Sequence, residues 1–302
     1  MNNYQSGLQK LFYHQKHLER IKRGYAVAPI HVSIFPTIRC QLSCKFCFCR
    51  NEKKDQPELS MEDFTNAITV LKKYGTKALE FSGGGEPLLW QNFVAGVRLA
   101  HDKGFKLSLI TNGLALENIP HEILSMFSWI RVSVYSMEQL EKVKFTYIPK
   151  GITVSLSYIL FEGMDIKKLH DFAKANNLIT RIAVPQPSTQ QFEDVALDIV
   201  RRFGRPFFFS QKPRGTPAGC YMAWVRGAID WEGFFLPCPA TMIGHNEIQG
   251  RFRLCHAQDL ERWIKENRPK DLGFKCGFCN CGKEINDFIH TLKNGVKDVE
   301  FV

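Results

Sequence analysis

The sequence lacks any apolar run of the length that a membrane span or a secretory signal peptide requires. A span needs about 18 consecutive apolar residues, and no segment of the 302-residue chain approaches that length. Residues 1–16, MNNYQSGLQKLFYHQK, contain no apolar core of signal-peptide type. We therefore expect a cytoplasmic protein with no membrane partner.

Cysteine is absent from residues 50–219, although the chain contains ten cysteines. They form an early group and a late group: Cys40, Cys44, Cys47 and Cys49, then Cys220, Cys238, Cys255, Cys276, Cys279 and Cys281. In a reducing compartment cysteines serve metal binding or catalysis more often than disulfides. The split predicts two metal centres in two regions of the chain.

No internal repeat or low-complexity tract is present, and 44% hydrophobic with 23% charged residues is ordinary globular composition. The net charge of +10 is compatible with an acidic peptide, a phosphate or a nucleic acid as partner. The clearest local excess of positive charge lies in residues 10–23, which we interpret as a solvated helix face. The charge is otherwise not concentrated, which argues against nucleic acid.

Residues 30–185 alternate short β-rich runs with helical patterns, which is typical of βα units around a parallel sheet. The expected strands are 30–35, 78–81, 106–110, 130–135, 153–159 and 180–184. A helix capped by Ser60 and ended by Gly75 follows the first strand, and others are expected at 91–104, 165–176 and 191–203. Six strands are fewer than the eight of a closed TIM barrel, so we predict an α/β fold with a partial (β/α)6 TIM-like barrel.

Three regions follow from this pattern. We expect an N-terminal helical extension at 1–29, a core barrel at 30–204, and a small cysteine-rich module at 205–302. The last region contains all six late cysteines and many glycines and prolines.

Cys40-x3-Cys44-x2-Cys47 directly follows the first expected strand. Closely spaced thiolates are ligands for zinc or iron–sulfur clusters. Three ligands leave one coordination position open, and an open position separates reactive metal sites from structural ones. Cys49 is an alternative fourth ligand, and a zinc knuckle is the alternative site.

The segment CQLSCKFC at 40–47, with Phe46 before the third cysteine, resembles the cluster motif of the radical S-adenosylmethionine (SAM) superfamily. The resemblance implies that Cys40, Cys44 and Cys47 hold a 4Fe–4S cluster whose fourth iron is chelated by SAM. It implies an enzyme that reductively cleaves SAM to a 5′-deoxyadenosyl radical, which abstracts a hydrogen atom from the substrate. It also implies a reductant such as flavodoxin or ferredoxin as a partner.

The run FSGGGEPLL at 81–89 closes the second expected strand. Glycines let a backbone approach a ligand closely, and no Gly-Lys-Ser/Thr follows, so the run is not a P-loop. Gly84, Gly85, Glu86 and Pro87 resemble the family's GGEP segment, whose backbone and glutamate contact the SAM amino group.

Two further strand ends resemble the same family. Asn112 lies in a Thr-Asn-Gly segment after the third strand, and Ser133 matches a position that approaches the SAM ribose. All these motifs fall at carboxyl ends of strands, where catalytic residues of βα barrels collect.

The late cysteines predict a second centre. Two apolar runs around Asp230-x-x-Gly233 are typical of a β-hairpin that brings Cys220 and Cys238 to one metal. With the CGFCNC run at 276–281, they resemble the auxiliary-cluster modules of radical SAM enzymes, of the SPASM and shorter twitch types. The resemblance implies a second 4Fe–4S cluster. Its ligands would be Cys220, Cys238, Cys276 and Cys279, with Cys281 as the alternative to Cys279; zinc fits four thiolates equally well.

The resemblance leaves substrate and reaction class open between oxidoreductase and isomerase. The leading hypothesis is modification of a ribosomal peptide by epimerisation or cross-linking. The alternative is a dehydrogenase or epimerase of a sugar, aminocyclitol or nucleotide, and a distant one is a zinc-stabilised nucleic-acid-binding protein. Cys255 is the candidate hydrogen donor to a substrate radical.

Overall fold

The computed structural model describes residues 7–45, 47, 49, 57–161, 163–185, 189–211, 215–242, 252–274 and 282–295. Its strands join in one ten-stranded sheet of order β10-β9-β8-β1-β2-β3-β4-β5-β6-β7. The strands are β1 (His31–Ile34), β2 (Ala78–Phe81), β3 (Lys106–Thr111), β4 (Phe127–Val134), β5 (Thr153–Ile159), β6 (Ile179–Ala183), β7 (Phe207–Phe209), β8 (Arg226–Ile229), β9 (Phe234–Leu236) and β10 (Cys255–His256).

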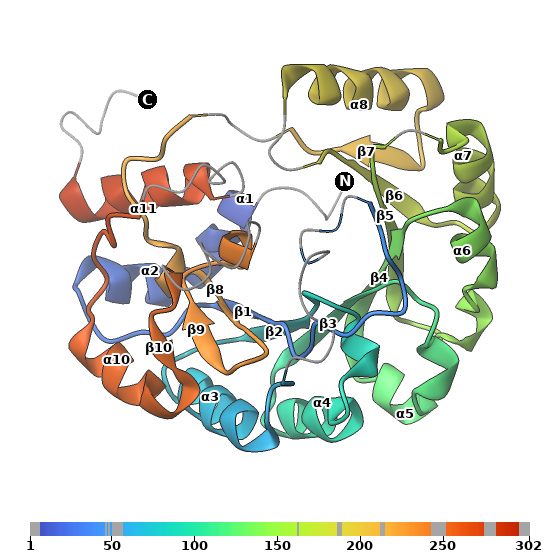
Figure 1. Cartoon of the computed structure of the whole chain (residues 1–302). Helices are drawn as coiled ribbons and strands as arrows, with labels where there is room; N and C mark the ends of the chain where they lie inside the picture. The colour runs from blue at the N-terminus through green and yellow to red at the C-terminus, as the bar shows by residue number, and fades with distance from the viewer. Residues whose placement is uncertain are drawn as a thin grey trace.

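The α-helices largely alternate with these strands. They are α1 (Gly7–Leu11), α2 (Gln15–Lys22), α3 (Met61–Lys73), α4 (Phe93–Asp102), α5 (His121–Leu124), α6 (Met137–Lys142), α7 (Ile166–Ala175), α8 (Gln190–Phe203), α10 (Leu260–Glu266) and α11 (Lys283–Asn294). Figure 1 shows the sheet curving around the centre of the molecule, with α3 to α8 on its outer side. Among the described residues, none of the helices combines the length and apolar character needed to cross a bilayer.

The sheet is parallel from β8 through β1 to β7, and among the described strands the antiparallel pairings are those of β9 with β8 and with β10. The fold is therefore the predicted α/β barrel type, and all six expected barrel strands are present as β1 to β6. The predicted hairpin is also confirmed, since β8 and β9 pair in antiparallel fashion and the Gly233 N–H donates to the Asp230 carbonyl at 3.0 Å.

Two pairings were not expected from the sequence. Strand β7 pairs in parallel with β6, and β8 pairs in parallel with β1. Both strands lie in the predicted 205–302 module, yet both extend the barrel sheet. The described part of that region is thus continuous with the barrel, and the boundary at 204 stays a prediction.

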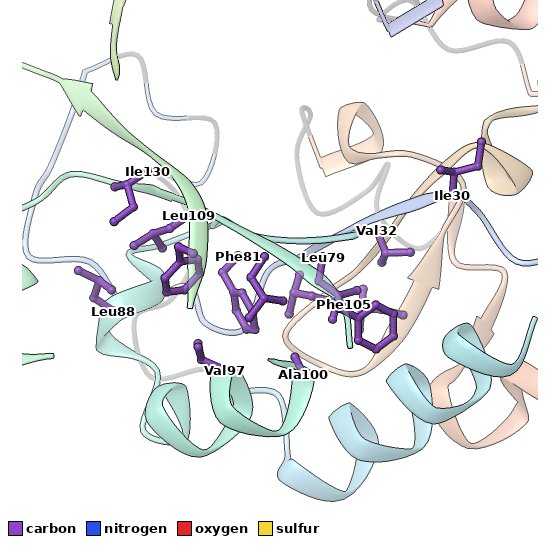
Figure 2. Close-up of a cluster of buried hydrophobic side chains, with 14 of the residues drawn as sticks. Ile30, Val32, Leu79, Phe81, Leu88, Val97, Ala100, Phe105, Leu109 and Ile130 are labelled. Carbon is purple, nitrogen blue, oxygen red and sulfur yellow. The ribbon is translucent and has the colours of Figure 1, made fainter. Parts of the chain in front are cut away.

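The main core lies between the sheet and the outer helices. Strand side chains at alternate positions point to one face, because successive residues of a strand alternate in direction. Val32, Leu79 and Leu109 are fully buried on this face, and Figure 2 shows them on the side of the sheet that faces Val97 and Ala100 of α4. The opposite strand face therefore points toward the barrel interior.

Helix α3 shows how local sequence fixes these layers. The Ser60 hydroxyl accepts a hydrogen bond from the Asp63 N–H at 3.0 Å, as the predicted cap requires. Phe64, Ile68 and Leu71 form the fully buried stripe of the helix. This helix returns the chain from β1 to β2.

The N-terminal helices pack against the C-terminal part of the chain. His17 of α2 lies 2.8 Å from the Trp224 carbonyl oxygen, and Phe12 makes an edge contact with Phe288 of α11 at 5.9 Å between ring centroids. Burial lowers the pKa of His17 to about 4, and nearby His14, Arg20 and Lys77 lower it further while the bond to Trp224 opposes the shift. The folded chain therefore holds this imidazole neutral.

We expect acid to destabilise this packing. The folded pKa of His17 lies below its ordinary value of 6.5, so the unfolded chain binds the proton first and stability falls as the pH drops from 6.5 toward 4. His17→Gln keeps an amide donor for Trp224 but does not titrate. Urea unfolding at pH 7 and pH 5 should show a loss smaller in the variant by on the order of 1 kcal/mol. Equal losses in both proteins would contradict this assignment.

Candidate functional site

The candidate site lies where β1, β2 and β3 end. The cysteine segment follows β1, the glycine run follows β2, and Asn112 follows β3. The three strands are neighbours and parallel, so their carboxyl ends meet at one edge of the sheet. The sequence predicted this convergence, because parallel βα units place all such ends on the same face.

The backbone of the glycine run clamps the cysteine segment. The Gly85 N–H donates to the Thr37 carbonyl at 2.9 Å, and the Glu86 N–H donates to the Arg39 carbonyl at 2.8 Å. A Cβ on Gly85 would overlap the carbonyl oxygen of Arg39 and the carbonyl carbon of Ile38. Gly85 is therefore small because the chain's own backbone passes beside it, whereas the sequence analysis attributed the glycines to a ligand.

Gly84 is confined by side chains. A Cβ there would lie 2.7 Å from the Trp231 ring and 3.1 Å from the Cys49 sulfur. Cys49 and Trp231 are buried in a small cluster with Phe35, Ile38, Ala228 and Leu236. Cys49 thus packs as a small hydrophobic residue in the cluster that contains Trp231 of the turn between β8 and β9.

The Glu86 carboxylate joins the ends of β2 and β3. One oxygen accepts from the Thr111 hydroxyl at 2.6 Å and the Leu88 N–H at 3.2 Å, and the other accepts from the Asn112 N–H at 2.7 Å. The residue is 2% exposed, and burial raises its pKa to about 7 against the opposing effect of these bonds. Both oxygens have partners within the protein, and a contact between Glu86 and the SAM amino group stays a prediction. Pro87 follows as the first residue of a short 3-10 turn.

Asn112 connects this framework to the first cysteine. Its side-chain nitrogen lies 3.9 Å from the Cys40 sulfur, and its side-chain oxygen accepts from Gln41 at 3.3 Å and from the Leu114 N–H at 3.0 Å. Asn112 is 7% exposed, so these bonds fix its amide. The structure brings together Cys40, the glycine run and Asn112, as the resemblance implied.

Gln139 was missed by the sequence reasoning. Its side-chain nitrogen donates to the Asn112 carbonyl at 2.5 Å and to the Ser133 carbonyl at 3.2 Å, so it ties the ends of β3 and β4 together. Its N–H donates to the Ser136 hydroxyl at 3.1 Å. The Ser-x-x-Gln spacing at 136–139 is a capping-box signal that would have marked this residue. Ser133 is half-buried on β4 and pairs with Ser157 of β5.

The three early cysteines share one segment. The Cys47 N–H donates to the Cys44 carbonyl at 3.1 Å. Burial raises the pKa of Cys44 to about 11, and Cys47 and Cys40 raise it further. Burial also raises the pKa of Cys40, while the Leu42 N–H and Asn112 amide that point at its sulfur oppose the shift. The thiols are thus close enough to repel one another as anions.

A soft cation suits this donor set, because thiolates are the preferred ligands of iron–sulfur clusters and zinc. Metal binding deprotonates thiols that burial and mutual repulsion otherwise keep protonated. Within the described ranges, no three His, Cys, Asp or Glu side chains already form a group able to hold a metal ion. The residues fit a cluster by chemistry and by their shared segment.

The late cysteines are only partly described. Cys220 is buried, and its N–H donates to the Asp271 carboxylate at 2.7 Å while its carbonyl accepts from the Leu272 N–H at 3.1 Å. Cys238 follows β9 and is half-buried. Cys276, Cys279 and Cys281 lie outside the described residues. The second cluster therefore stays a prediction.

Cys255 lies on β10, the edge strand of the sheet. Burial raises the pKa of its thiol to about 12, Asp259 raises it further, and Arg262 lowers it. In the sheet, β9 and β8 separate β10 from β1. Its role as hydrogen donor stays a prediction.

Comparisons with known proteins identify the same region. Residues 34–144 match the family model described as the radical SAM superfamily. An S-adenosylmethionine-dependent nucleotide dehydratase of Selenomonas ruminantium is 36% identical over 110 residues, which are 35% of this chain and 39% of that protein. A probable GTP 3′,8-cyclase of Methanocella arvoryzae is 30% identical over 53% of this chain and 57% of its own length. The chain thus spans less than two thirds of these curated relatives.

Solved structures share the fold. Streptococcus suis SuiB bound to S-adenosylmethionine superposes with a TM-score of 0.57 and 14% identity, over 86% of this chain and 75% of that chain. Native anSMEcpe with bound AdoMet gives 0.54 and 13%, over 79% and 81%. At this identity the likeness shows the fold.

We expect Gly85→Ala to disrupt the clamp. The added Cβ meets backbone that cannot rotate away, so the free energy of unfolding should fall by about 3 kcal/mol or more, and reconstituted iron should drop with it. Gly75→Ala is the matched control, since Gly75 has φ +110° and nothing within 4 Å of an added Cβ; it should cost about 1–2 kcal/mol through backbone conformation alone. Urea unfolding and iron analysis check both variants. If Gly85→Ala keeps the iron content of wild type, the clamp is not needed to position the cysteine ligands.

Proposed function

We propose that this chain, which carries a radical SAM domain over residues 34–144, is a radical SAM enzyme. When bound, a 4Fe–4S cluster supplies the electron that cleaves SAM to methionine and a 5′-deoxyadenosyl radical, which removes a hydrogen atom from the substrate. The observation that carries the proposal is the Cys40 segment held by Gly85, Glu86 and Asn112 at the ends of β1 to β3. The family match falls on these same residues.

The residues divide into ligands and positioning groups. Cys40, Cys44 and Cys47 would hold the cluster, and the segment at 84–87, Asn112 and Ser133 would line the SAM site. The Asn112 amide points a donor at the Cys40 sulfur at 3.9 Å, which favours the thiolate form of that ligand. Glu86 keeps Asn112 in place through the Asn112 N–H, so we assign it a positioning role.

A second 4Fe–4S cluster in a twitch- or SPASM-like module belongs to the same proposal. Cys220, Cys238, Cys276 and Cys279 would hold it, with Cys281 as the alternative to Cys279. One described contact supports this arrangement: Leu272 donates to the Cys220 carbonyl at 3.1 Å. The segment that leads to Cys276 is therefore hydrogen-bonded to Cys220 at Leu272.

For the substrate, two classes have support. One is a ribosomal peptide, modified by epimerisation or cross-linking; SuiB bound to precursor peptide SuiA shares the fold, with a TM-score of 0.54 over 99% of this chain. A nucleotide, sugar or aminocyclitol is favoured by the nucleotide-directed relatives and by arginines on the interior strand face described below. A reductant such as flavodoxin or ferredoxin would supply the electron.

We expect Cys44→Ala to abolish SAM cleavage. Removing one of three thiolates leaves the cluster without its ligand set, so anaerobic protein with dithionite should form 5′-deoxyadenosine at least about 100-fold more slowly than wild type. Cys255→Ala is the matched control, because a donor to the substrate radical acts after SAM cleavage. Chromatography of the quenched reaction measures the product. Undiminished product from Cys44→Ala, or none from wild type, would refute the proposed function.

Metal analysis tests the second cluster. The double variant Cys276→Ala/Cys279→Ala should retain about half of the wild-type iron and sulfide, since each cluster holds four irons, and should still cleave SAM. Zinc in place of iron in the wild-type protein would instead support the zinc-binding alternative. An unchanged iron content in the double variant would exclude Cys276 and Cys279 as ligands.

A further inference from the structure

A row of polar side chains crosses the sheet beside the candidate site. In the parallel register Ser133 of β4 pairs with Ser157 of β5, Ser157 pairs with Arg181 of β6, and Arg181 pairs with Phe208 of β7. Thr111 pairs with Val132, so Asn112 continues the row on the β3 side. Residues paired across neighbouring strands point to the same face of a sheet. The row therefore ends at Asn112, whose side-chain nitrogen lies 3.9 Å from the Cys40 sulfur.

The row faces the barrel interior. The alternating residues Val132, Leu156 and Ile182 are fully buried in the core between sheet and helices. Ser133, Ser157 and Arg181 lie between them in sequence, so they point to the opposite face, away from α5, α6 and α7 (Figure 1). All three are half-buried, which leaves part of each side chain accessible.

A second row lies one step nearer the amino ends of the strands. Arg131 of β4 pairs with Ser155 of β5 on the same interior face. Ser155 is 3% exposed, and its hydroxyl has no hydrogen-bond partner among the described residues. A buried hydroxyl of this kind is a group that a ligand or water would satisfy.

Two arginines, Arg131 and Arg181, project from this interior face. Glu80 also lies there, since it pairs in register with Ser33 and Ser108, but its carboxylate is in an ion pair with Arg226 at 3.2 Å and accepts from the Ser33 hydroxyl at 2.9 Å. The neighbouring charges of Arg226, His31 and Arg131 and the Ser33 bond outweigh burial and lower the pKa of Glu80. Arg226 is therefore an ion-pair partner of the buried Glu80 carboxylate.

We propose that Arg181 and Arg131, with the hydroxyl of Ser157 on the strand between them, bind a phosphate group of the substrate, so that the substrate is a phosphorylated small molecule. The proposal rests on the proposed function and specifies its substrate class. Arginine presents a planar fork of donors that matches phosphate in a bidentate manner, and serine hydroxyls add single donors. Two guanidinium groups with a hydroxyl between them suit a group with several anionic oxygens better than a single carboxylate.

The spacing fits a substrate that spans the barrel. Arg181 lies three strands from the Asn112 end of the row, or roughly 14 Å at about 4.8 Å per strand. A phosphate held there would leave the rest of the molecule to extend past Ser133 toward the cysteine segment. Arg181 is thus a specificity-determining residue that anchors the substrate away from the reacting atoms.

Binding of inorganic pyrophosphate and of a nucleoside triphosphate, measured by titration calorimetry on the full chain, tests this site without SAM cleavage. Wild type should bind both anions. Arg181→Met should weaken both at least about tenfold, and Ser157→Ala severalfold. Arg98→Met is the matched control: it removes the same charge from the exposed outer helix α4, where Arg98 pairs with Glu122 at 3.5 Å. Its binding should equal that of wild type.

Several outcomes would overturn the proposal. The first is that wild type does not bind pyrophosphate, and the second is that Arg98→Met and Arg181→Met weaken pyrophosphate binding equally. The third is that a tri-glutamate peptide binds wild type as tightly as pyrophosphate does and that Arg181→Met weakens its binding as much. If the melting temperature of Arg181→Met is lower than that of wild type, Arg181→Lys is measured instead. Lysine keeps the positive charge but lacks the planar guanidinium donors, so this variant should bind pyrophosphate severalfold more weakly than wild type. Wild-type 5′-deoxyadenosine formation is measured in parallel. Absence of 5′-deoxyadenosine would refute the proposed function, whereas the anion-binding result is judged by calorimetry alone.

Discussion

The candidate site depends on the buried carboxylate of Glu86. It is 2% exposed, and it accepts from the Thr111 hydroxyl and from the N–H groups of Asn112 and Leu88. A buried carboxylate without hydrogen bonds would be strongly destabilising, so these three donors are what allow it to stay. Their geometry fixes the end of β3 relative to the end of β2. Glu86 holds the Asn112 backbone N–H, and Gln139, Gln41 and Leu114 hold the rest of the residue that aims a donor at Cys40.

The backbone clamp complements that carboxylate. Gly85 and Glu86 donate their N–H groups to the carbonyls of Thr37 and Arg39, so two backbone hydrogen bonds anchor the segment leading to Cys40. The loop that carries the three thiols buries Ile38 and Cys49 in a small apolar cluster with Trp231. Its position also depends on the two backbone bonds, which only a residue without a Cβ permits at Gly85. The glycine motif predicts that some group approaches the backbone closely. The structure places the backbone of Ile38 and Arg39 beside Gly85, and a contact of the run with SAM stays a prediction.

The parts of the fold set by local pattern were predictable from the sequence. The six barrel strands and the Ser60 cap follow from alternation, periodicity and capping chemistry, which act over a few residues. The three-residue strand Phe207–Phe209 and the parallel pairing of Arg226–Ile229 with β1 were not predicted. Both depend on the unpaired edges of the barrel sheet, which is a tertiary property. Gln139 was missed for the same reason, since its cap is local but its bonds to Asn112 and Ser133 cross strands.

Fold and substrate chemistry are separate properties in this molecule. The solved structures that share the barrel are 13–14% identical to this chain, and a fold at that distance does not transmit a substrate. The side chains on the interior strand face are set by the sequence, and they include Arg131 and Arg181. An apolar or carboxylate-rich interior would repel the same ligand through desolvation or like charge. The backbone therefore explains where SAM chemistry would take place, and the interior arginines explain which molecules would be held there.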